Sequence, residues 1–212
     1  MELSQYVDLN SKQIVSEVDS FTEKRYVQFL GYLDKEDKKI LDIGCNTGRG
    51  GNVLRQLNPH LRLTGLDIIE ERIKKIPAGI YERLILSPAD KIEVEDNYFD
   101  AAVAGEVIEH IHPNDVPAVL KEQKRILRPG GKLLLTTPNP RALLVRLGRD
   151  AVLKDPSHIC LMLPSELRKK LHDSGFEKVV VKGSGKLTQY LPDNFPVLSV
   201  FGSYLSIATK PA

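Results

Sequence analysis

The chain has 212 residues, of which 42% are hydrophobic and 27% are charged, and its formal net charge is +2. This composition allows one sizeable hydrophobic core, and so small a net charge makes nucleic acid an unlikely partner. The chain has no apolar run of membrane-spanning length, and its first residues lack a signal-peptide pattern. Two cysteines do not make a disulfide framework, so we expect a protein of the reducing cytoplasm without a membrane span.

Apolar runs alternate with amphipathic segments along the chain, a pattern that predicts an α/β fold with a parallel sheet covered by helices on both faces. Residues 12–33 predict one or two amphipathic helices that lie over a ligand cleft. The predicted strands are 39–43, 61–66, 82–86, 99–104, 132–137, 176–183 and 198–210. The predicted helices that follow the first strand are 50–57, 69–76, 114–127 and 164–173.

The most informative segment is residues 39–50, KILDIGCNTGRG, in which an apolar strand leads into a glycine turn and then a helix. Gly44 and Gly48 allow the backbone to approach a ligand where a side chain would collide. The glycine spacing, which ends at Gly50, differs from the G-x-G-x-x-G of dinucleotide sites and disfavours a nicotinamide-dependent oxidoreductase. Asp42 would repel a pyrophosphate but suits a ligand that carries an ammonium group.

This segment resembles motif I of class I S-adenosylmethionine-dependent methyltransferases of the type 11/23 kind, and the resemblance extends over residues 38–182. The family usually has glycine where this chain has Asn46, and asparagine also tolerates a left-handed backbone. The resemblance implies S-adenosylmethionine as cofactor, S-adenosylhomocysteine as product, and a Rossmann-like seven-stranded sheet of order 3-2-1-4-5-7-6 with strand 7 antiparallel. The cofactor-binding residues that it implies here are Asp42, Gly44, Cys45, Asn46 and Gly48.

A second acidic residue, Asp67, stands at the tip of the second strand, 19 positions after Gly48. An acid at this distance can accept hydrogen bonds from both ribose hydroxyls of an adenosine, and it resembles motif II. Asp67 also precedes a predicted helix, so it can serve as a helix cap as well. We expect the neighbouring Ile68 to contribute to the same site.

The adenine contact departs from the family pattern. Many relatives have an acid twelve positions before the FD of the fourth strand, where this chain has Pro88. We therefore expect Asp90, or the backbone of Ala89, to take its place.

The fourth strand runs into AGEVIEHIHPND, in which Glu106, Glu109 and His110 have the spacing i, i+3, i+4. A helical turn would bring these side chains together at the carboxyl edge of the sheet. Two carboxylates and an imidazole within one turn are costly unless a positive charge lies between them. The cluster resembles two metal-using groups, the small-RNA 3′-terminal 2′-O-methyltransferases and the ubiquinone-pathway O-methyltransferases, and the RNA group adds a histidine in a loop that corresponds to His158.

The resemblance thus implies a set of ligands for Mg²⁺, Mn²⁺, Fe²⁺ or Zn²⁺, formed by Glu106, Glu109, His110 and His158. Such an ion would lower the pKa of an acceptor hydroxyl and orient its oxygen. Two alternatives remain open. In the first, His110 or His158 is a general base and Glu106 contacts cofactor or substrate. In the second, the cluster is structural.

The segment 138–163 is a candidate lid on the substrate side, and residues 1–35 a candidate helical cap, of one methyltransferase domain that spans 1–212. Within the segment, basic residues alternate with leucines, either as a solvated amphipathic helix or as a lid that presents arginine to an anionic group. The basic residues are Arg141, Arg146, Arg149 and Lys154.

We expect the enzyme to methylate a hydroxyl of a small molecule such as a saccharide or a quinone- or phenol-type compound. The alternatives are RNA 3′-terminal 2′-O-methylation, N- or C-methylation, and a non-catalytic subunit that binds S-adenosylmethionine. RNA is disfavoured by the modest charge. No residue pattern indicates an oligomeric state.

Overall fold

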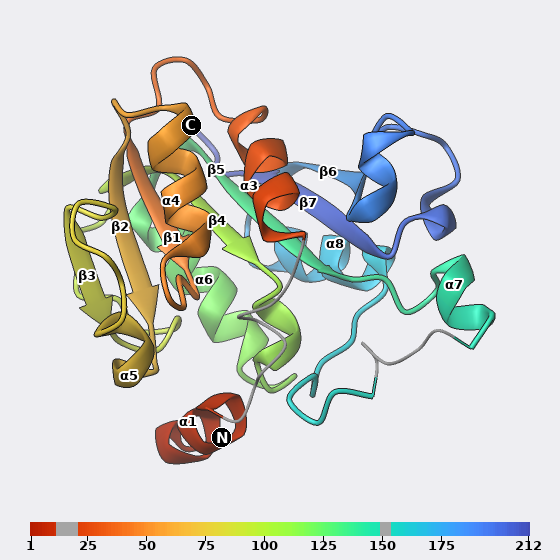
Figure 1. The fold of residues 1–212 in the computed structure, drawn as a ribbon, viewed down its shortest axis with the longest axis horizontal. Coiled ribbons are helices and arrows are strands. Elements are labelled where there is room, and N and C mark those ends of the chain that lie inside the picture. The colour runs from red at the N-terminus through yellow and green to blue at the C-terminus, as the bar shows by residue number, and fades with distance from the viewer. Residues whose placement is uncertain (12–20, 149–153) are drawn as a thin grey trace.

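A computed structural model of the chain describes residues 1–11, 21–148 and 154–212. Its sheet has seven strands in the order β3-β2-β1-β4-β5-β7-β6 (Figure 1). β7 is antiparallel to both β5 and β6, and the other neighbours are parallel, which confirms the order that the resemblance implied. The strands are β1 Lys39–Ile43, β2 Arg62–Asp67, β3 Arg83–Leu86, β4 Phe99–Gly105, β5 Leu127–Pro138, β6 Glu177–Ser184 and β7 Ser203–Thr209.

Helices cover both faces of this sheet. α3 and α4 lie on one face, and α6 and α8 on the other, while α1 and α7 lie beyond the carboxyl ends of the central strands (Figure 1). The helices and helical turns in the described ranges are α1 Leu3–Ser11, α3 Thr22–Leu30, α4 Arg49–Leu57, α5 Glu70–Ile73, η1 Ile108–His110, α6 Val116–Ile126, α7 Leu143–Arg146, α8 Pro164–Asp173, η3 Lys186–Gln189 and η4 Leu198–Val200.

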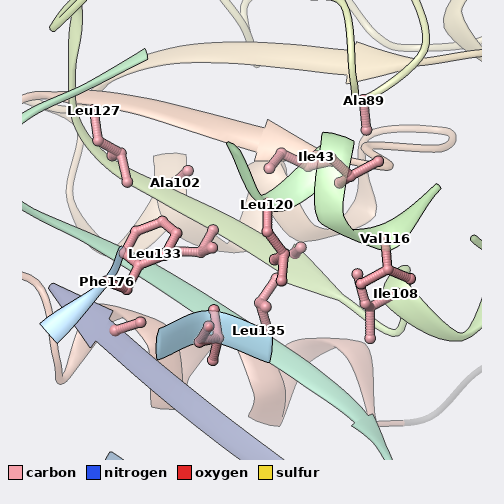
Figure 2. Packing of buried hydrophobic residues seen from close by; sticks show 14 of the residues in the cluster. Ile43, Ala89, Ala102, Ile108, Val116, Leu120, Leu127, Leu133, Leu135 and Phe176 are labelled. Atoms are coloured by element: carbon pink, nitrogen blue, oxygen red, sulfur yellow. The ribbon is translucent and has the colours of Figure 1, made fainter. Parts of the chain in front are cut away.

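The central strands are mostly apolar, as expected for strands that are covered on both faces. On β4, Ala102 belongs to the core beneath α6 and α8, whereas Val103 belongs to the core beneath α3 and α4. Figure 2 shows the first of these cores, where Leu133 and Leu135 of β5 pack near Leu120 of α6. The central strands are thus packed on both faces, and the site lies at the carboxyl edge of the sheet.

Several predicted boundaries were wrong. The helix predicted at 69–76 is a single turn, Glu70–Ile73, and the last strand begins at Ser203 because Leu198–Val200 form a 3₁₀ turn. β5 begins at Leu127 rather than 132, since Phe99 pairs with Leu127 and a bulge then shifts the register.

The N-terminal region also differs from its prediction. α1 lies upstream of the predicted helices, and α3 lies within the 12–33 prediction, of which 12–20 fall outside the described residues. None of the helices that the structure describes is long and apolar enough to cross a membrane.

Candidate functional site

A cavity of about 790 Å³ opens at the carboxyl ends of β1, β2 and β4. This volume is within the range of about 300–1,000 Å³ that small-molecule sites occupy. The predicted site residues that line it are Gly44, Cys45, Asn46, Asp67, Ile68, Ala89, Asp90, Glu106, His110 and His158. Three predicted residues do not line the cavity, although each is next in sequence to a residue that does. They are Asp42, Gly48 and Glu109.

The glycine turn after β1 has the backbone that the sequence predicted. Gly44, Asn46 and Gly48 have φ of 68°, 50° and 84°, so the asparagine does adopt the left-handed conformation. A Cβ built on Gly44 would lie 2.6 Å from Cγ2 of Val107, so no side chain fits there. Gly48 does not face the cavity, and its conformation ends the turn where α4 begins.

Asp67 stands in the cavity wall at the tip of β2, where it is 4% exposed. Its carboxylate accepts one hydrogen bond from the backbone N–H of Asn46 and one from that of Ile69, both at 2.9 Å. Burial raises the pKa of this carboxyl. The two bonds connect the glycine turn to the residue before α5 and hold the carboxylate at the cavity. Ile69 is the N-cap of α5, so Asp67 is not the helix cap that the sequence also allowed.

Asp42 was predicted to face the ammonium group of a ligand. The structure places it behind the cavity wall instead. It is fully buried, and its two oxygens accept hydrogen bonds from the hydroxyls of Tyr26 at 2.6 Å and Tyr81 at 2.5 Å. Burial raises its pKa to about 7. Because both oxygens already have hydroxyl partners behind the cavity wall, the side chain does not present a carboxylate to a ligand.

A second group of side chains gathers at the carboxyl ends of β4 and β5. Glu109, His110 and His158 each offer one ligand atom, and these atoms lie within 4.8 Å of one another. The two imidazole rings have centroids 4.8 Å apart. The loop that follows β5 therefore returns His158 to the turn that carries His110, as the sequence predicted.

The tautomer of His110 follows from its surroundings. Nδ1 lies 3.0 Å from the carbonyl oxygen of Ser157, and since a carbonyl only accepts, Nδ1 must carry the proton and Nε2 the lone pair. Burial and the neighbouring His158 lower the pKa of His110 to about 4. His110 is therefore neutral at pH 7.

Glu109 lies behind the two histidines and is fully buried. Its Oε2 accepts a hydrogen bond from the Thr137 hydroxyl at 3.1 Å, whereas Oε1 has no hydrogen-bond partner among the described residues. Burial, and then the charge of Glu106, raise its pKa well above the usual value. A buried carboxyl with an unpartnered oxygen calls for a proton or a cation beside it.

Glu106 does not join this cluster, so the predicted set of four is reduced to three. Its φ is 57°, and the helical turn begins only at Ile108, so the helical spacing does not extend back to it. Glu106 instead faces Arg25, whose Nε lies 3.6 Å from Oε1, and its Oε2 accepts a weak hydrogen bond from the Ser203 hydroxyl at 3.4 Å.

The N-terminal helices contribute cavity residues that carry no motif. Arg25 and Tyr26 of α3 and Tyr6 of α1 all line the cavity. The Tyr6 hydroxyl donates to Asp115 at 2.6 Å, and Arg72 donates to the carbonyl of Asn10 at 2.5 Å, so α1 is attached on both sides of the cavity. The only advance signal was the amphipathic pattern of 12–33, which predicted a cover but not which side chains it presents.

The candidate lid, residues 138–163, contributes Leu144 of α7, Asp155 and His158 to the cavity wall. Arg141, Arg146 and Lys154 are exposed and are not part of the cavity wall, and Arg149 is outside the described residues. The described part of this segment does not present arginine to the site.

Residues 17–181 match a family model described as a methyltransferase domain, which covers more than half of the chain. The chain belongs to the class I S-adenosylmethionine-dependent methyltransferases. A solved structure from Thermotoga maritima, described as a possible histamine N-methyltransferase, superposes on this methyltransferase with a TM-score of 0.72 at 20% identity and covers 99% of this chain and 100% of that one. At this identity the likeness shows the fold alone.

Two curated relatives illustrate the range of named activities. Phosphoethanolamine N-methyltransferase 3 of Arabidopsis thaliana is 30% identical over 173 residues, 76% of this chain and 33% of that protein. A ubiquinone biosynthesis O-methyltransferase of Thiobacillus denitrificans is 26% identical over 162 residues, 69% of this chain and 67% of that protein. The chain thus spans only a third to two thirds of the length of these curated relatives.

Proposed function

We propose that this chain transfers the methyl group of S-adenosylmethionine to a hydroxyl oxygen of a small-molecule acceptor, such as a saccharide or a quinone- or phenol-type compound. The observation that carries the proposal is that Asp67 and the Gly44 turn line the same cavity as His110 and His158. One end of the cavity offers a carboxylate to ribose hydroxyls, and the other offers neutral imidazole to an acceptor proton.

The residues at the β1 and β2 edge suit S-adenosylmethionine. Gly44 leaves backbone exposed in the cavity wall where no Cβ fits, and the buried Asp67 carboxylate is oriented by two backbone N–H groups. When bound, S-adenosylmethionine supplies an electrophilic methyl group, and its sulfonium becomes a neutral thioether as that group leaves.

The histidines supply what a hydroxyl acceptor requires. A neutral hydroxyl is a weak nucleophile, and its proton must leave as the new carbon–oxygen bond forms. The Ser157 carbonyl holds the Nδ1 proton of His110, so the lone pair on Nε2 can take the acceptor proton. His158, whose ligand atom lies within 4.8 Å of that of His110, can then take this proton on.

Metal assistance is a second candidate, favoured by the same three residues. Glu109, His110 and His158 would hold a divalent ion, since one Glu109 oxygen has no hydrogen-bond partner in the described chain and the ligand atoms lie within 4.8 Å. The ion would lower the pKa of the acceptor hydroxyl. If the ion is required, EDTA abolishes turnover and added Mg²⁺, Mn²⁺, Fe²⁺ or Zn²⁺ restores it. Full turnover in the chelator removes this candidate and leaves His110 as a general base.

Oxygen is favoured over nitrogen as the acceptor atom by the buried bases. The two relatives reported above are named for N- and for O-methylation, so they do not choose between the atoms. An amine attacks through its own lone pair and needs no base before the methyl group transfers, whereas a hydroxyl benefits from one.

A matched pair of acceptors tests the proposal. Purified protein is supplied with S-adenosylmethionine and either a catechol or the aminophenol that replaces one hydroxyl by an amine, and the methylated products are separated by mass spectrometry. We expect an O-methyl product from both. Methylation confined to the amine contradicts O-transfer, and transfer to the 3′ end of an RNA oligonucleotide alone favours the RNA alternative.

A further inference from the structure

Two tyrosine hydroxyls converge on the buried Asp42 from separate parts of the chain. Tyr26 comes from α3 and donates to Oδ1, and Tyr81 comes from the segment before β3 and donates to Oδ2. Tyr26 also lines the cavity, whereas Tyr81 does not. One carboxylate on β1 thus connects α3 to the segment before β3.

The paired glycines at the start of α4 make room for these two rings. A Cβ built on Gly50 would lie 2.0 Å from Cζ of Tyr26, and one built on Gly51 would lie 2.2 Å from the hydroxyl oxygen of Tyr81. Glycine within a helix costs roughly 1 kcal/mol relative to alanine, so this pair is unfavourable for α4 alone. The absence of side chains at Gly50 and Gly51 therefore makes room for the two tyrosines.

The residue beside Tyr26 forms part of the cavity wall. Arg25 lines the cavity, its side chain is 10% exposed, and its Nε lies 3.6 Å from Oε1 of Glu106. A Cβ built on Gly105 would lie 2.9 Å from Cδ of Arg25, so the arginine lies tightly against the end of β4. The orientation of α3 about its axis decides whether Arg25 reaches this place.

We propose that Asp42 is a positioning residue that acts through Tyr26, holding α3 so that Arg25 meets Glu106 in the wall of the cofactor cavity. Tyr81 makes the matching hydrogen bond on the other oxygen but carries no cavity residue, so it contributes stability only. This inference rests on the proposed function, since it gives the cavity wall a role in binding S-adenosylmethionine.

The two tyrosines provide a matched pair of variants, because Tyr26→Phe and Tyr81→Phe each remove one hydroxyl from the same carboxylate. α3 remains attached in Tyr26→Phe, since Phe29 is fully buried and Gln28 donates to the Gly183 carbonyl at 2.8 Å. Both variants should therefore fold and lose melting temperature to a similar degree. Only Tyr26→Phe should weaken S-adenosylhomocysteine binding in calorimetry, by about tenfold, as for the loss of one buried hydrogen bond.

A double-mutant cycle separates positioning from direct contact. If Tyr26 acts through Arg25, then adding Tyr26→Phe to Arg25→Ala should change S-adenosylhomocysteine affinity less than about twofold, because coupled residues are not additive. Equal weakening by the two phenylalanine variants, or additive effects of Tyr26→Phe and Arg25→Ala, overturns the inference.

A measurement that needs no ligand tests the positioning role of Tyr26 independently of the proposed function. Amide hydrogen exchange across residues 22–30 should be faster in Tyr26→Phe and unchanged in Tyr81→Phe. If the unmodified chain fails to bind S-adenosylhomocysteine, the proposed function falls, and this exchange experiment still decides whether Tyr26 positions α3. Equal exchange in both variants overturns the positioning role.

Discussion

The two ends of the cavity are built in different ways. At the β1 and β2 edge, the Asp67 carboxylate accepts the backbone N–H of Ile69, two positions away, and that of Asn46, 21 positions away in the turn after the neighbouring strand. At the β4 and β5 edge, His110 and His158 meet only because a long segment after β5 folds back on the 3₁₀ turn. The first end is built from the turns that follow two neighbouring strands, and the second from packing between segments further apart in the chain.

Two carboxylates at the first edge show that position in a motif does not determine a role. Asp67 lines the cavity and accepts backbone N–H groups, whereas Asp42 lies behind the wall and accepts tyrosine hydroxyls. Both are almost completely buried. What distinguishes them is which groups the tertiary structure brings to their oxygens.

The largest expected effect is a loss of kcat without a loss of cofactor binding. Replacing His110 by alanine removes the base from the β4 edge, so kcat should fall by about 10²- to 10⁴-fold, the usual contribution of a general base. S-adenosylhomocysteine affinity should stay within about twofold, because the two ends of the cavity are separately built. Steady-state kinetics and calorimetry measure the two quantities. His60→Ala, an exposed histidine outside the cavity, is the control. A parallel loss of affinity in His110→Ala would show that the ends are not independent.

A pH dependence of stability tests the placement of Asp42. The folded chain holds its proton up to about pH 7, whereas an unfolded aspartate with a pKa of 3.8 releases it earlier. The free energy of unfolding should therefore decrease as pH rises from about 4 to 7, by at most about 4 kcal/mol at 1.36 kcal/mol per pKa unit. Asp42→Asn cannot titrate and should lose the part of this dependence that Asp42 contributes, so its stability should fall less over the same range. Urea unfolding of both proteins across this range measures it, and parallel curves would contradict the buried placement.

The smallest expected effect is a loss of S-adenosylhomocysteine affinity when Asp67 is replaced. It distinguishes Asp67 from a carboxylate with a structural role alone. Asp67→Ala should weaken S-adenosylhomocysteine binding by about 10- to 100-fold, because two charge-assisted hydrogen bonds to the ribose are lost. Asp100 also accepts backbone N–H groups, from Lys38 and Lys39, but is not part of the cavity wall. Asp100→Ala should cost stability and leave the affinity unchanged. Calorimetry that shows equal affinities for both variants would refute the role of Asp67 as a ribose ligand.

Sequence by itself determined the features that depend on near neighbours. Hydrophobic periodicity located the strands of the sheet, and the left-handed Asn46 followed from the backbone preferences of asparagine. Asp67 was predicted from its distance after Gly48 and its likeness to motif II. It also predicted the meeting of His110 and His158, through the resemblance to metal-using relatives. The strands and the left-handed Asn46 need only a strand, a turn and a helix in order, whereas the meeting of the two histidines depends on packing between distant segments.

The tertiary structure alone decided which side chains meet across elements. The exclusion of Glu106 from the histidine cluster depends on a left-handed residue before the 3₁₀ turn, and the partners of Asp42 come from α3 and from the segment before β3. Arg25 reaches the cavity only through the way α3 packs on the sheet. Such contacts are set by the packing of elements far apart in the chain, and no local pattern of residue types specifies them.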